Sequence, residues 1–521
     1  MEQFSDSNVV VYRINEIIEK AGNGHTYQRR ALYVFGLQWL IGSFFVMGYP
    51  FLFLEPPLVC KDPANPSQTF PCNATLACSG EYNYTFAEEG VDSLVKEFNL
   101  VCNQSWLRLA MASVFVGGAL GSFYSADLSE RKGRFHSIMF AIVSVVFFGA
   151  ISIFSWNIVM FAICSLLIDF SLRGFMNNSL VYMTELSSEN IRTLTPSLLN
   201  MCFAIGQMIF PILVYYFSGW RTIMSLVFTL PIIITFLFYR TMNESPRFLN
   251  IKEQWQETRE AILNMARINN RSIPPFALFD ELDKAATQER LAERNMQDDQ
   301  LNVKLNYSML TLFKYNSLKM TTLALIYMHL VISAIYYVLW YSSDPLYPDI
   351  HTNFFISGAI ELFGYLISAF LALNQRRKIT IKGSFVATGI CIILSWFFNT
   401  ASTNTISFGN QYAVIIFIAG KVFACVATNT LLIYVLEFYP TRVRHFAIGF
   451  FAVITRFILV LVPALIQTSS DLAVSPLLLL GGLSIGSFFL VTYCPETYEK
   501  PLQDHITEEK DRLLGRELDE Y

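Results

Sequence analysis

The chain has 521 residues, of which 53% are apolar and only 15% are Asp, Glu, Lys or Arg. A soluble globular protein carries about 25% charged residues, so this composition excludes an ordinary soluble chain and indicates an integral membrane protein. The net charge is −4 and no basic tract is interleaved with aromatic residues, which argues against nucleic-acid binding.

Twelve apolar stretches are long enough to cross a bilayer as helices, which takes about 20 residues each. In chain order they are 31–54, 107–127, 135–155, 157–183, 195–217, 220–240, 320–342, 353–373, 380–400, 411–438, 445–468 and 472–494. They are too long and too continuous for barrel strands, and the first is too long for the core of a signal peptide. The sequence therefore predicts an all-α membrane protein with twelve transmembrane helices.

Basic residues beside these stretches favour one side of the membrane. Arg29 and Arg30 precede the first stretch and Arg131 follows the second, whereas the loop 55–105 is mostly acidic. Since cytosolic loops are rich in Lys and Arg, we expect both termini in the cytosol. The expected parts are a cytosolic N-terminus (1–30), a six-helix half (31–240) with its outer loop (55–105), a cytosolic helical loop (241–319), a second six-helix half (320–494) and a cytosolic tail (495–521).

The outer loop has features of an oxidising compartment. It holds four of the nine cysteines, namely Cys60, Cys72, Cys78 and Cys102. Four cysteines allow three pairings, and the sequence does not select one. Three acceptor sequons for N-glycosylation lie in the same loop, at Asn73, Asn83 and Asn103. These features predict disulfides, glycosylation and a plasma-membrane location, with an organellar membrane as the alternative.

A pattern of charges recurs along the chain. Glu185 and Arg192 are matched 252 positions later by Glu437 and Arg444, and the acid at Glu244 recurs at the same offset. Three matches at one offset indicate a duplicated six-helix unit, an architecture of transporters that bind their substrate between the halves. The alternative is that these are unrelated charges beside the membrane.

The same charges predict a gate at the cytosolic ends of the helices. Exposed ion pairs contribute only about 0–1 kcal/mol each, which suits a latch that breaks in every cycle. A glycine in the turn between spans 2 and 3 permits a tight reversal. The expected gating residues are Glu130, Arg131, Gly133, Arg134, Glu185, Arg192, Glu244, Arg247, Glu437, Arg444 and Glu496.

Several segments carry a family resemblance. They are residues 437–444 (EFYPTRVR), 244–249 (ESPRFL), 495–497 (PET), and the Cys-bearing loop that ends in Asn-Leu-Val-Cys at 99–102. They resemble the major facilitator superfamily and, within it, the organic cation/anion/carnitine transporter family. The resemblance covers nearly the whole chain and implies two six-helix halves that carry a small organic ion by alternating access.

Two segments depart from the family pattern. The loop motif at 126–134 has Ala where the family has its first glycine, and Glu where the family has Asp. The copy between spans 8 and 9 keeps only Arg376, Arg377 and Lys378, having lost its acid and glycine. This loss puts the second gate in doubt and supports an alternative of another class, a transport-inactive structural subunit of a larger membrane assembly.

Five charged residues lie well inside the apolar stretches, where a charge costs about 2.5–3.5 kcal/mol and is a candidate functional group. They are Asp169, Arg173, Glu361, Lys421 and Arg456. Asp169 and Arg173 are four residues apart on one helix face, so a structural pair within the helix is the favoured interpretation for them.

Arg456, halfway along span 11, is the strongest candidate for substrate binding. The resemblance implies an acid at this position in cation-preferring members and Arg in anion- and carnitine-type members. A guanidinium binds a carboxylate through two parallel hydrogen bonds, so the substrate is predicted to carry an anionic group. Two alternatives are a permanent pair with Glu361, and a zwitterion whose quaternary ammonium contacts Glu361 and aromatic rings.

The remaining substrate-binding candidates are Glu361, Lys421, Tyr336, Tyr337 and Trp340. The resemblance supports the first four, whereas packing or anchoring at the interface is an equal alternative for Trp340. Glycines at 117 and 121, and again at 482 and 486, predict close approach of helices.

The sequence contains no pattern of a metal site or an ATP-binding loop. We therefore expect no enzyme activity, no metal and no cofactor. The expected function is secondary transport of a small organic anion or zwitterion, carnitine-like, with organic cation transport as the alternative. The expected partners are this substrate, the lipid bilayer and a coupling ion or exchanged anion; the sequence identifies no protein partner and no nucleic acid.

Overall fold

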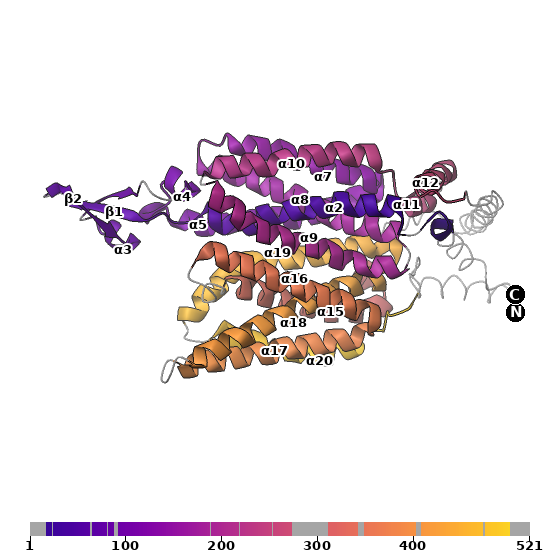
Figure 1. Cartoon of the computed structure of the whole chain (residues 1–521). Helices are drawn as coiled ribbons and strands as arrows, with labels where there is room; N and C mark the ends of the chain where they lie inside the picture. Colours follow the sequence, from indigo (N-terminus) through magenta and orange to yellow (C-terminus); the bar gives the residue numbers. More distant parts are fainter. Residues whose placement is uncertain are drawn as a thin grey trace.

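The computed structural model describes residues 17–22, 24–62, 65–80, 82–87, 92–187, 189–217, 219–252, 254–272, 311–341, 349–402, 408–471 and 475–500. Long helices form a bundle, a small sheet projects from one of its ends, and helices α11 and α12 lie at the other (Figure 1). We name these the sheet end and the α11 end.

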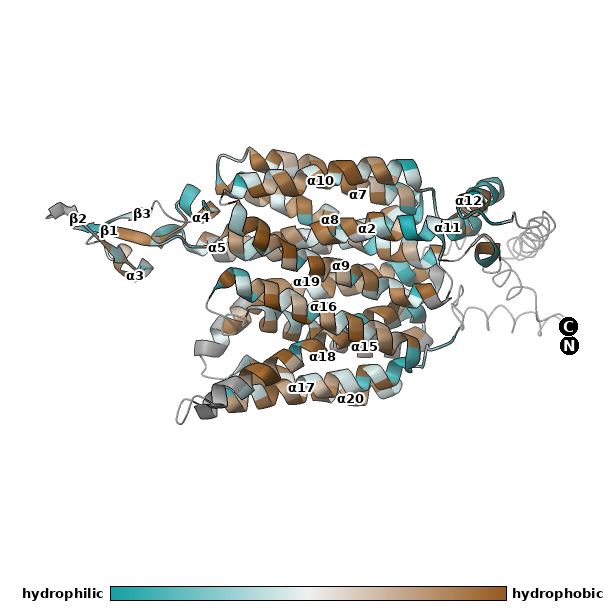
Figure 2. Cartoon of the chain, viewed as in Figure 1, coloured by the Kyte–Doolittle hydropathy of each residue, from teal (hydrophilic) through white to brown (hydrophobic). Residues whose placement is uncertain are grey.

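Eleven helices in the described ranges are long and apolar enough to cross a membrane. They are α2 (Thr26–Leu52), α7 (Arg134–Ile153), α8 (Ile158–Leu186), α9 (Glu189–Tyr216), α10 (Trp220–Thr241), α15 (Asn316–Tyr341), α16 (Ile350–Asn374), α17 (Arg377–Ser402), α18 (Phe408–Phe438), α19 (Thr441–Asp471) and α20 (Pro476–Leu490). Each coincides with one predicted span. Figure 2 shows apolar residues along these helices and hydrophilic residues gathered near α11 and α12. The helical membrane fold is confirmed.

The second predicted span differs from the others because it is interrupted. Residues 107–127 are divided among α5 (Trp106–Ala110), the 3-10 turn η2 (Met111–Phe115) and α6 (Val116–Lys132). The 17 residues of α6 end in a polar segment that includes Asp127, Glu130 and Arg131, so its mean hydropathy is low. Hydropathy located this span but gave no sign of the break.

The helices of the two predicted halves lie on opposite sides of the bundle, indigo to magenta and orange to yellow in Figure 1. Along the boundary, α9 packs against α16 and α6 packs against α19. These two helix–helix interfaces bring residues from distant parts of the sequence next to each other.

Two glycines allow α6 to approach α8. A Cβ atom on Gly117 or Gly121 would overlap the backbone carbonyl oxygen of Leu166 or Phe170, respectively. The corresponding prediction for Gly482 is wrong, because a Cβ there would meet no atom within 4 Å.

The close contact near the end of the chain uses other glycines. A Cβ on Gly481 would lie 2.6 Å from Cγ1 of Ile393, and a Cβ on Gly389 would lie 2.6 Å from the carbonyl oxygen of Gly481. The contact therefore joins α20 to α17 through the neighbouring glycine. Spacing alone did not indicate which face of α20 meets a helix.

The outer loop folds into a three-stranded antiparallel sheet, which the all-helical prediction did not include. The order is β2 (Asn65–Cys72), β1 (Leu58–Asp62) and β3 (Asn83–Phe86). Short helices α3 (Ala74–Ala77) and α4 (Leu94–Glu97) and the turn η1 (Cys102–Gln104) complete the segment. Cys60 pairs with Cys72 and Cys78 pairs with Cys102, one of the three possible connectivities. The three sequon residues Asn73, Asn83 and Asn103 are all exposed.

The outer segment is joined to the start of α10. Trp220 donates from its indole nitrogen to Glu97, at 2.7 Å, and from its backbone nitrogen to the carbonyl oxygen of Asp92, at 3.1 Å. Arg221 forms an ion pair with Glu97. These contacts attach the sheet to the first set of helices.

At the α11 end, three short helices are described: α11 (Pro246–Ile251), α12 (Trp255–Ile268) and α14 (Thr311–Lys314). Asn269 accepts a hydrogen bond from the backbone of Tyr27 and donates to the carbonyl oxygens of Ala21 and Gly22, so α12 is bound to the start of α2. Residues 273–310 of the predicted cytosolic loop and residues 501–521 of the predicted tail lie outside the described residues.

Candidate functional site

A buried ionic cluster lies where α6, α7 and α8 meet at the α11 end. Arg134 donates to Glu185 and Glu130, with its Nη2 atom 3.0 Å from an oxygen of each. Arg134 is 1% exposed, because Gly133 reverses the chain at φ 100° and turns it inward. The carboxylate of Glu244 accepts from the backbone nitrogens of Arg134 and Phe135. We name these residues the first cluster.

Glu244 lies beyond the end of α10, outside the membrane-spanning helices. Burial raises the pKa of its carboxyl group, although the backbone N–H groups of Ser245 and Phe135 and the charge of Arg134 act in the opposite direction. The group stays in place because it caps the first turn of α7, where N–H groups lack partners within the helix.

A second cluster repeats this arrangement at the start of α17. Arg377 forms an ion pair with Glu437, with Nη2 and Oε1 3.0 Å apart. Glu496 accepts from the backbone nitrogens of Arg377 and Lys378, at 2.9 and 3.2 Å. We name Arg377, Glu437 and Glu496 the second cluster.

Arg377 was missing from the predicted gating residues, although it occupies the place of Arg134. The available signal was the retained Arg376-Arg377-Lys378 run, which was interpreted as the remnant of a lost motif. One partner has no counterpart: Leu373 stands four residues before Arg377, where Glu130 stands four residues before Arg134. The lost acid and glycine therefore remove one contact and leave the remaining arrangement in place.

The two clusters are connected to the opposite halves. Thr193 on α9 donates to Glu437 at 3.3 Å and accepts from Arg377 at 3.4 Å. The Nε2 atom of His445 on α19 lies 3.7 Å from Glu130 and 3.8 Å from Glu185. The halves are thus joined at the α11 end.

The other predicted gating residues occupy different environments. Arg192, Arg247 and Arg444 are buried, with 7%, 8% and 1% of their surface exposed. Arg131 is 76% exposed and pairs with Asp127 of its own helix at 2.9 Å. Arg131 therefore lies outside the buried first cluster.

The charged residues of the middle of the bundle form two pairs between helices. Arg456 of α19 and Asp169 of α8 approach to 3.5 Å, and Lys421 of α18 and Glu361 of α16 approach to 3.1 Å. Each of these four side chains is at most 1% exposed. Arg173 lies one turn after Asp169 on α8 and is partly exposed. The sequence suggested two other pairs, Asp169 with Arg173 and Arg456 with Glu361. In the structure, Asp169 and Glu361 lie closest to Arg456 and Lys421, respectively.

The pair of Arg456 has unusual geometry. None of the three guanidinium nitrogens of Arg456 and neither carboxylate oxygen of Asp169 has an aligned hydrogen-bond partner among the described residues. The guanidinium carbon lies 5.4 Å from the ring centre of Phe115 in η2. Asp169 and Phe115 belong to one half and Arg456 to the other, so the site lies at the boundary.

The pair of Glu361 belongs to a hydrogen-bonded network. Tyr336 donates to Glu361 at 2.8 Å, Lys421 donates to Ser357, and Gln207 of α9 donates to Ser357 at 3.2 Å. The network therefore also crosses between the halves.

Tyr337 and Trp340 continue α15 toward the sheet end. Both are buried, at 5% and 7% exposure, and the rings of Tyr336 and Tyr337 are 5.3 Å apart. The ring of Trp340 lies 5.9 Å from that of Phe354, which lies 4.7 Å from Phe51 of α2. These aromatic contacts join the halves on the side of the pairs away from the two clusters.

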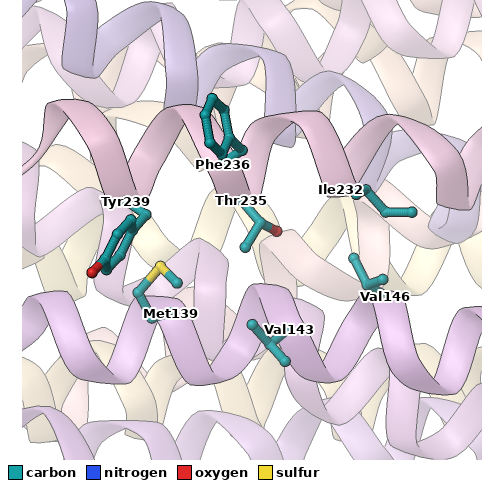
Figure 3. Close-up of a pocket in the computed structure, with 7 residues that line it drawn as sticks. All are labelled: Met139, Val143, Val146, Ile232, Thr235, Phe236 and Tyr239. Atoms are coloured by element: carbon teal, nitrogen blue, oxygen red, sulfur yellow. The ribbon is translucent and has the colours of Figure 1, made fainter.

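A separate apolar pocket lies between α7 and α10 (Figure 3), with a volume of about 360 Å³. Ile232 and Phe236 line it and are 54% and 60% exposed, so it opens on the outside of the bundle. It contains none of the predicted substrate-binding residues.

Comparisons with known proteins identify the family. A family model described as "Sugar (and other) transporter" matches residues 69–508. Human organic cation/carnitine transporter 2 is 26% identical over 419 residues, which cover 80% of this chain and 71% of that protein. An organic cation transporter-like protein of Drosophila melanogaster is 27% identical over 440 residues, covering 84% and 75%.

Solved structures share the fold. A proton:xylose symporter of the major facilitator superfamily, bound to 6-bromo-6-deoxy-D-glucose, gives a TM-score of 0.63 at 18% identity, covering 92% of this chain and 98% of that chain. The human organic anion transporter MFSD10 gives 0.55 at 14% identity, covering 89% and 100%. The chain belongs to the sugar (and other) transporter family, a family of transporters and not of enzymes.

Proposed function

We propose that the protein carries a small organic anion or a zwitterion across the membrane as a secondary transporter, by alternating access. The names of its relatives leave the charge of the substrate open, because they include organic cation and carnitine transporters. The observation that supports an anionic group is the charge balance of the middle of the bundle.

Three positive residues, Arg173, Lys421 and Arg456, stand there against two negative residues, Asp169 and Glu361. One positive charge is therefore uncompensated within this set. A net charge in a low-dielectric interior is costly, and a bound anion would neutralise it. A bound organic cation would instead raise the excess positive charge from one to two.

Arg456 is the residue that we expect to bind the anionic group. Its guanidinium faces Asp169 without an aligned hydrogen bond, so a substrate carboxylate that binds through two parallel hydrogen bonds would improve its coordination. Because Asp169 and Arg456 belong to different halves, replacing their contact by the substrate changes what holds the halves together. This is the coupling between binding and movement that alternating access requires.

A zwitterion such as carnitine would use the same site differently. Its carboxylate would contact Arg456, and its quaternary ammonium would lie against the faces of Tyr336, Tyr337 or Trp340. Glu361 is less accessible to a cation than the sequence indicated, because Lys421 and Tyr336 already bind it. This argues against the organic cation alternative.

The alternative of a transport-inactive structural subunit rested on the loss of the second loop motif. Arg377 binds Glu437 and is capped by Glu496, so the physical basis of that alternative is weakened. We also propose that the sheet end faces the outside of the plasma membrane and the α11 end faces the cytosol, on the grounds of the disulfides and the flanking basic residues.

Uptake into proteoliposomes tests the proposal. The purified protein is offered labelled carnitine, glutarate and tetraethylammonium in separate reactions. We expect uptake of carnitine or glutarate, loss of that uptake in Arg456→Gln, partial retention in Arg456→Lys, and retention in Arg267→Gln, a control at an exposed position of α12.

Two outcomes contradict the proposal. Uptake of tetraethylammonium alone, unchanged in Arg456→Gln, would establish a cation carrier. A correctly folded protein that carries none of the three compounds would favour the structural subunit.

A further inference from the structure

The pocket between α7 and α10 opens on the surface of the bundle that faces the membrane. Both helices are long and apolar enough to cross a bilayer, and Ile232 and Phe236 are more than half exposed. Met139 and Tyr239 face each other at one end of the pocket, and Val146 and Ile232 lie at the other (Figure 3). From Ile232 to Tyr239 the helix rises about 10 Å, so the pocket follows the helix axis, the direction in which a lipid chain lies.

The pocket is nearer to the α11 end of the bundle than to the sheet end. Because α7 begins at Arg134 and α10 ends at Thr241, Met139 and Tyr239 lie within about two turns of the α11 end. A lipid of the leaflet at that end would extend its acyl chain past Tyr239 into the pocket. Its headgroup would then lie just beyond Tyr239, at the end of α10.

Arg240 stands at the place of this headgroup. Its guanidinium carbon lies 5.4 Å from the ring centre of Phe236, which lines the pocket. Arg240 is exposed and forms no ion pair with a residue that the structure describes. The nearest acid along the chain, Glu244, is bound instead to the backbone N–H groups at the start of α7. An apolar pocket therefore ends beside an uncompensated positive charge, and a guanidinium binds a phosphate through two parallel hydrogen bonds.

The corresponding helices of the second half, α17 and α20, touch directly at the equivalent positions. Ser484, the counterpart of Ile232 at the offset of 252, donates to a backbone carbonyl oxygen of α17 at 2.7 Å. Phe488 is the counterpart of Phe236, and the ammonium group of Lys382 on α17 lies 4.9 Å from its ring centre. In the second half the cation over this ring thus comes from the facing helix, whereas α7 leaves the space open.

The headgroup decides which lipid the pocket selects. Hydrocarbon already surrounds an acyl chain in the membrane, so entering the pocket brings it van der Waals contacts and no hydrophobic gain. Such contacts do not distinguish one phospholipid from another with the same chains. A phosphatidylcholine carries its own ammonium group beside the phosphate, whereas a headgroup with a net negative charge would balance the charge of Arg240.

We propose that the pocket between α7 and α10 binds an anionic phospholipid, with one acyl chain along the two helices and the headgroup phosphate on Arg240. Tyr239 is exposed beside Arg240, as is typical of aromatic residues at the level of the headgroups. Both helices belong to one half of the molecule, so the lipid makes the same contacts whichever way the halves are turned. It therefore stabilises this half without favouring one conformation over the other.

Photo-crosslinking locates the lipid on the original protein. Phosphatidylserine with a diazirine in its acyl chain is reconstituted with the protein and irradiated, and the labelled peptides are identified by mass spectrometry. We expect the label on α7 and α10, with α17 and α20 as the internal control. Equal labelling of the two pairs of helices would overturn the proposal, because it would reflect the general contact of lipids with the bundle.

Native mass spectrometry of the delipidated protein measures the affinity for the first bound lipid. Phosphatidylserine should bind about fivefold more tightly than phosphatidylcholine with the same chains, the effect of one basic residue at an anionic surface. Arg240→Gln should abolish this preference. Arg376→Gln removes an exposed basic residue at the same end of the other half and should keep it. Equal binding of the two lipids, or a preference that survives in Arg240→Gln, would contradict the assigned role of Arg240.

Val143→Phe tests the place of the acyl chain. Val143 lines the pocket and is 49% exposed, so a phenyl ring can fill the pocket without entering the core. This variant should weaken the binding of both lipids, and unchanged binding would place the chain elsewhere. Displacement of the label by cholesteryl hemisuccinate alone, or crosslinks between two copies of the chain through α7 and α10, would assign the pocket to a sterol or to a dimer. No transported substrate is used, so these outcomes leave the transport proposal to its own test.

Discussion

Burial decides how much each arginine at the α11 end contributes to the stability of the fold. Arg134 and Arg377 are 1% and 3% exposed and bind Glu185 and Glu437, which are 0% and 9% exposed, whereas Arg131 is 76% exposed. An exposed pair is screened by water and contributes about 0–1 kcal/mol. Removing one partner of a buried pair leaves an uncompensated charge and costs about 3–5 kcal/mol. Similar contacts therefore differ greatly in their effect on stability.

The first prediction compares Arg134→Ala with Arg131→Ala. The Arg134 variant strands the carboxylate of Glu185, which is 0% exposed, and we expect a markedly lower Tm in detergent. The Arg131 variant should differ from the original protein by less than about 1 kcal/mol. Thermal unfolding of both purified variants measures the difference, and equal Tm values would contradict this account of the cluster.

The second prediction concerns Asp169, whose carboxylate lies 3.5 Å from the guanidinium that we propose binds the substrate, that of Arg456. Because Asp169→Asn removes the competing carboxylate, we expect KM for the transported anion to fall about tenfold or more, the effect of about 1.4 kcal/mol. Concentration-dependent uptake gives KM and the maximal rate separately. A raised KM would mean that Asp169 assists the substrate instead of competing with it.

At the scale of helices, packing depends on which face each glycine presents. Gly121 lies directly against the backbone of α8, whereas Gly482 has open space around its Cα atom. The two belong to the same sequence pattern, so spacing correctly identified one contact and misidentified the other. The pattern gives the distance between glycines along a helix but not the rotation of that helix.

The third prediction uses this contrast. A methyl group at Gly121 would overlap the carbonyl oxygen of Phe170, and overpacking of this kind costs about 1–3 kcal/mol. Gly121→Ala should therefore lower the Tm, while Gly482→Ala should leave it unchanged. Size-exclusion profiles of the two variants check that both remain folded, and a fall in the Tm of the Gly482 variant would contradict the described face of α20.

Eleven of the twelve predicted spans, and their order, followed from hydropathy, because a bilayer requires long apolar segments whatever their partners. The repeat placed Glu185 and Glu244 among the expected gating residues, and in the structure both bind Arg134. The partners of Arg456 and Glu361 could not be predicted, since they depend on how two halves rotate against each other. Arg377 was overlooked because the residues around it had changed while its own contacts remained.

The fourth prediction tests the orientation of the whole molecule. If the sheet end is outside, the sequons of the outer segment pass through the secretory pathway and become glycosylated. Treatment with peptide N-glycosidase F should increase electrophoretic mobility, and the triple change of Asn73, Asn83 and Asn103 to Gln should abolish that shift. A shift that persists in the triple variant would place the glycans elsewhere.

The attachment of α4 to α10 through Glu97, Trp220 and Arg221 links the outer segment, which carries the sheet, to one half of the transporter. An antibody fragment raised against the sheet would accordingly travel with that half as the carrier rocks. Such a fragment would supply a landmark for electron cryomicroscopy, distinguishing two bundles that look nearly alike in projection.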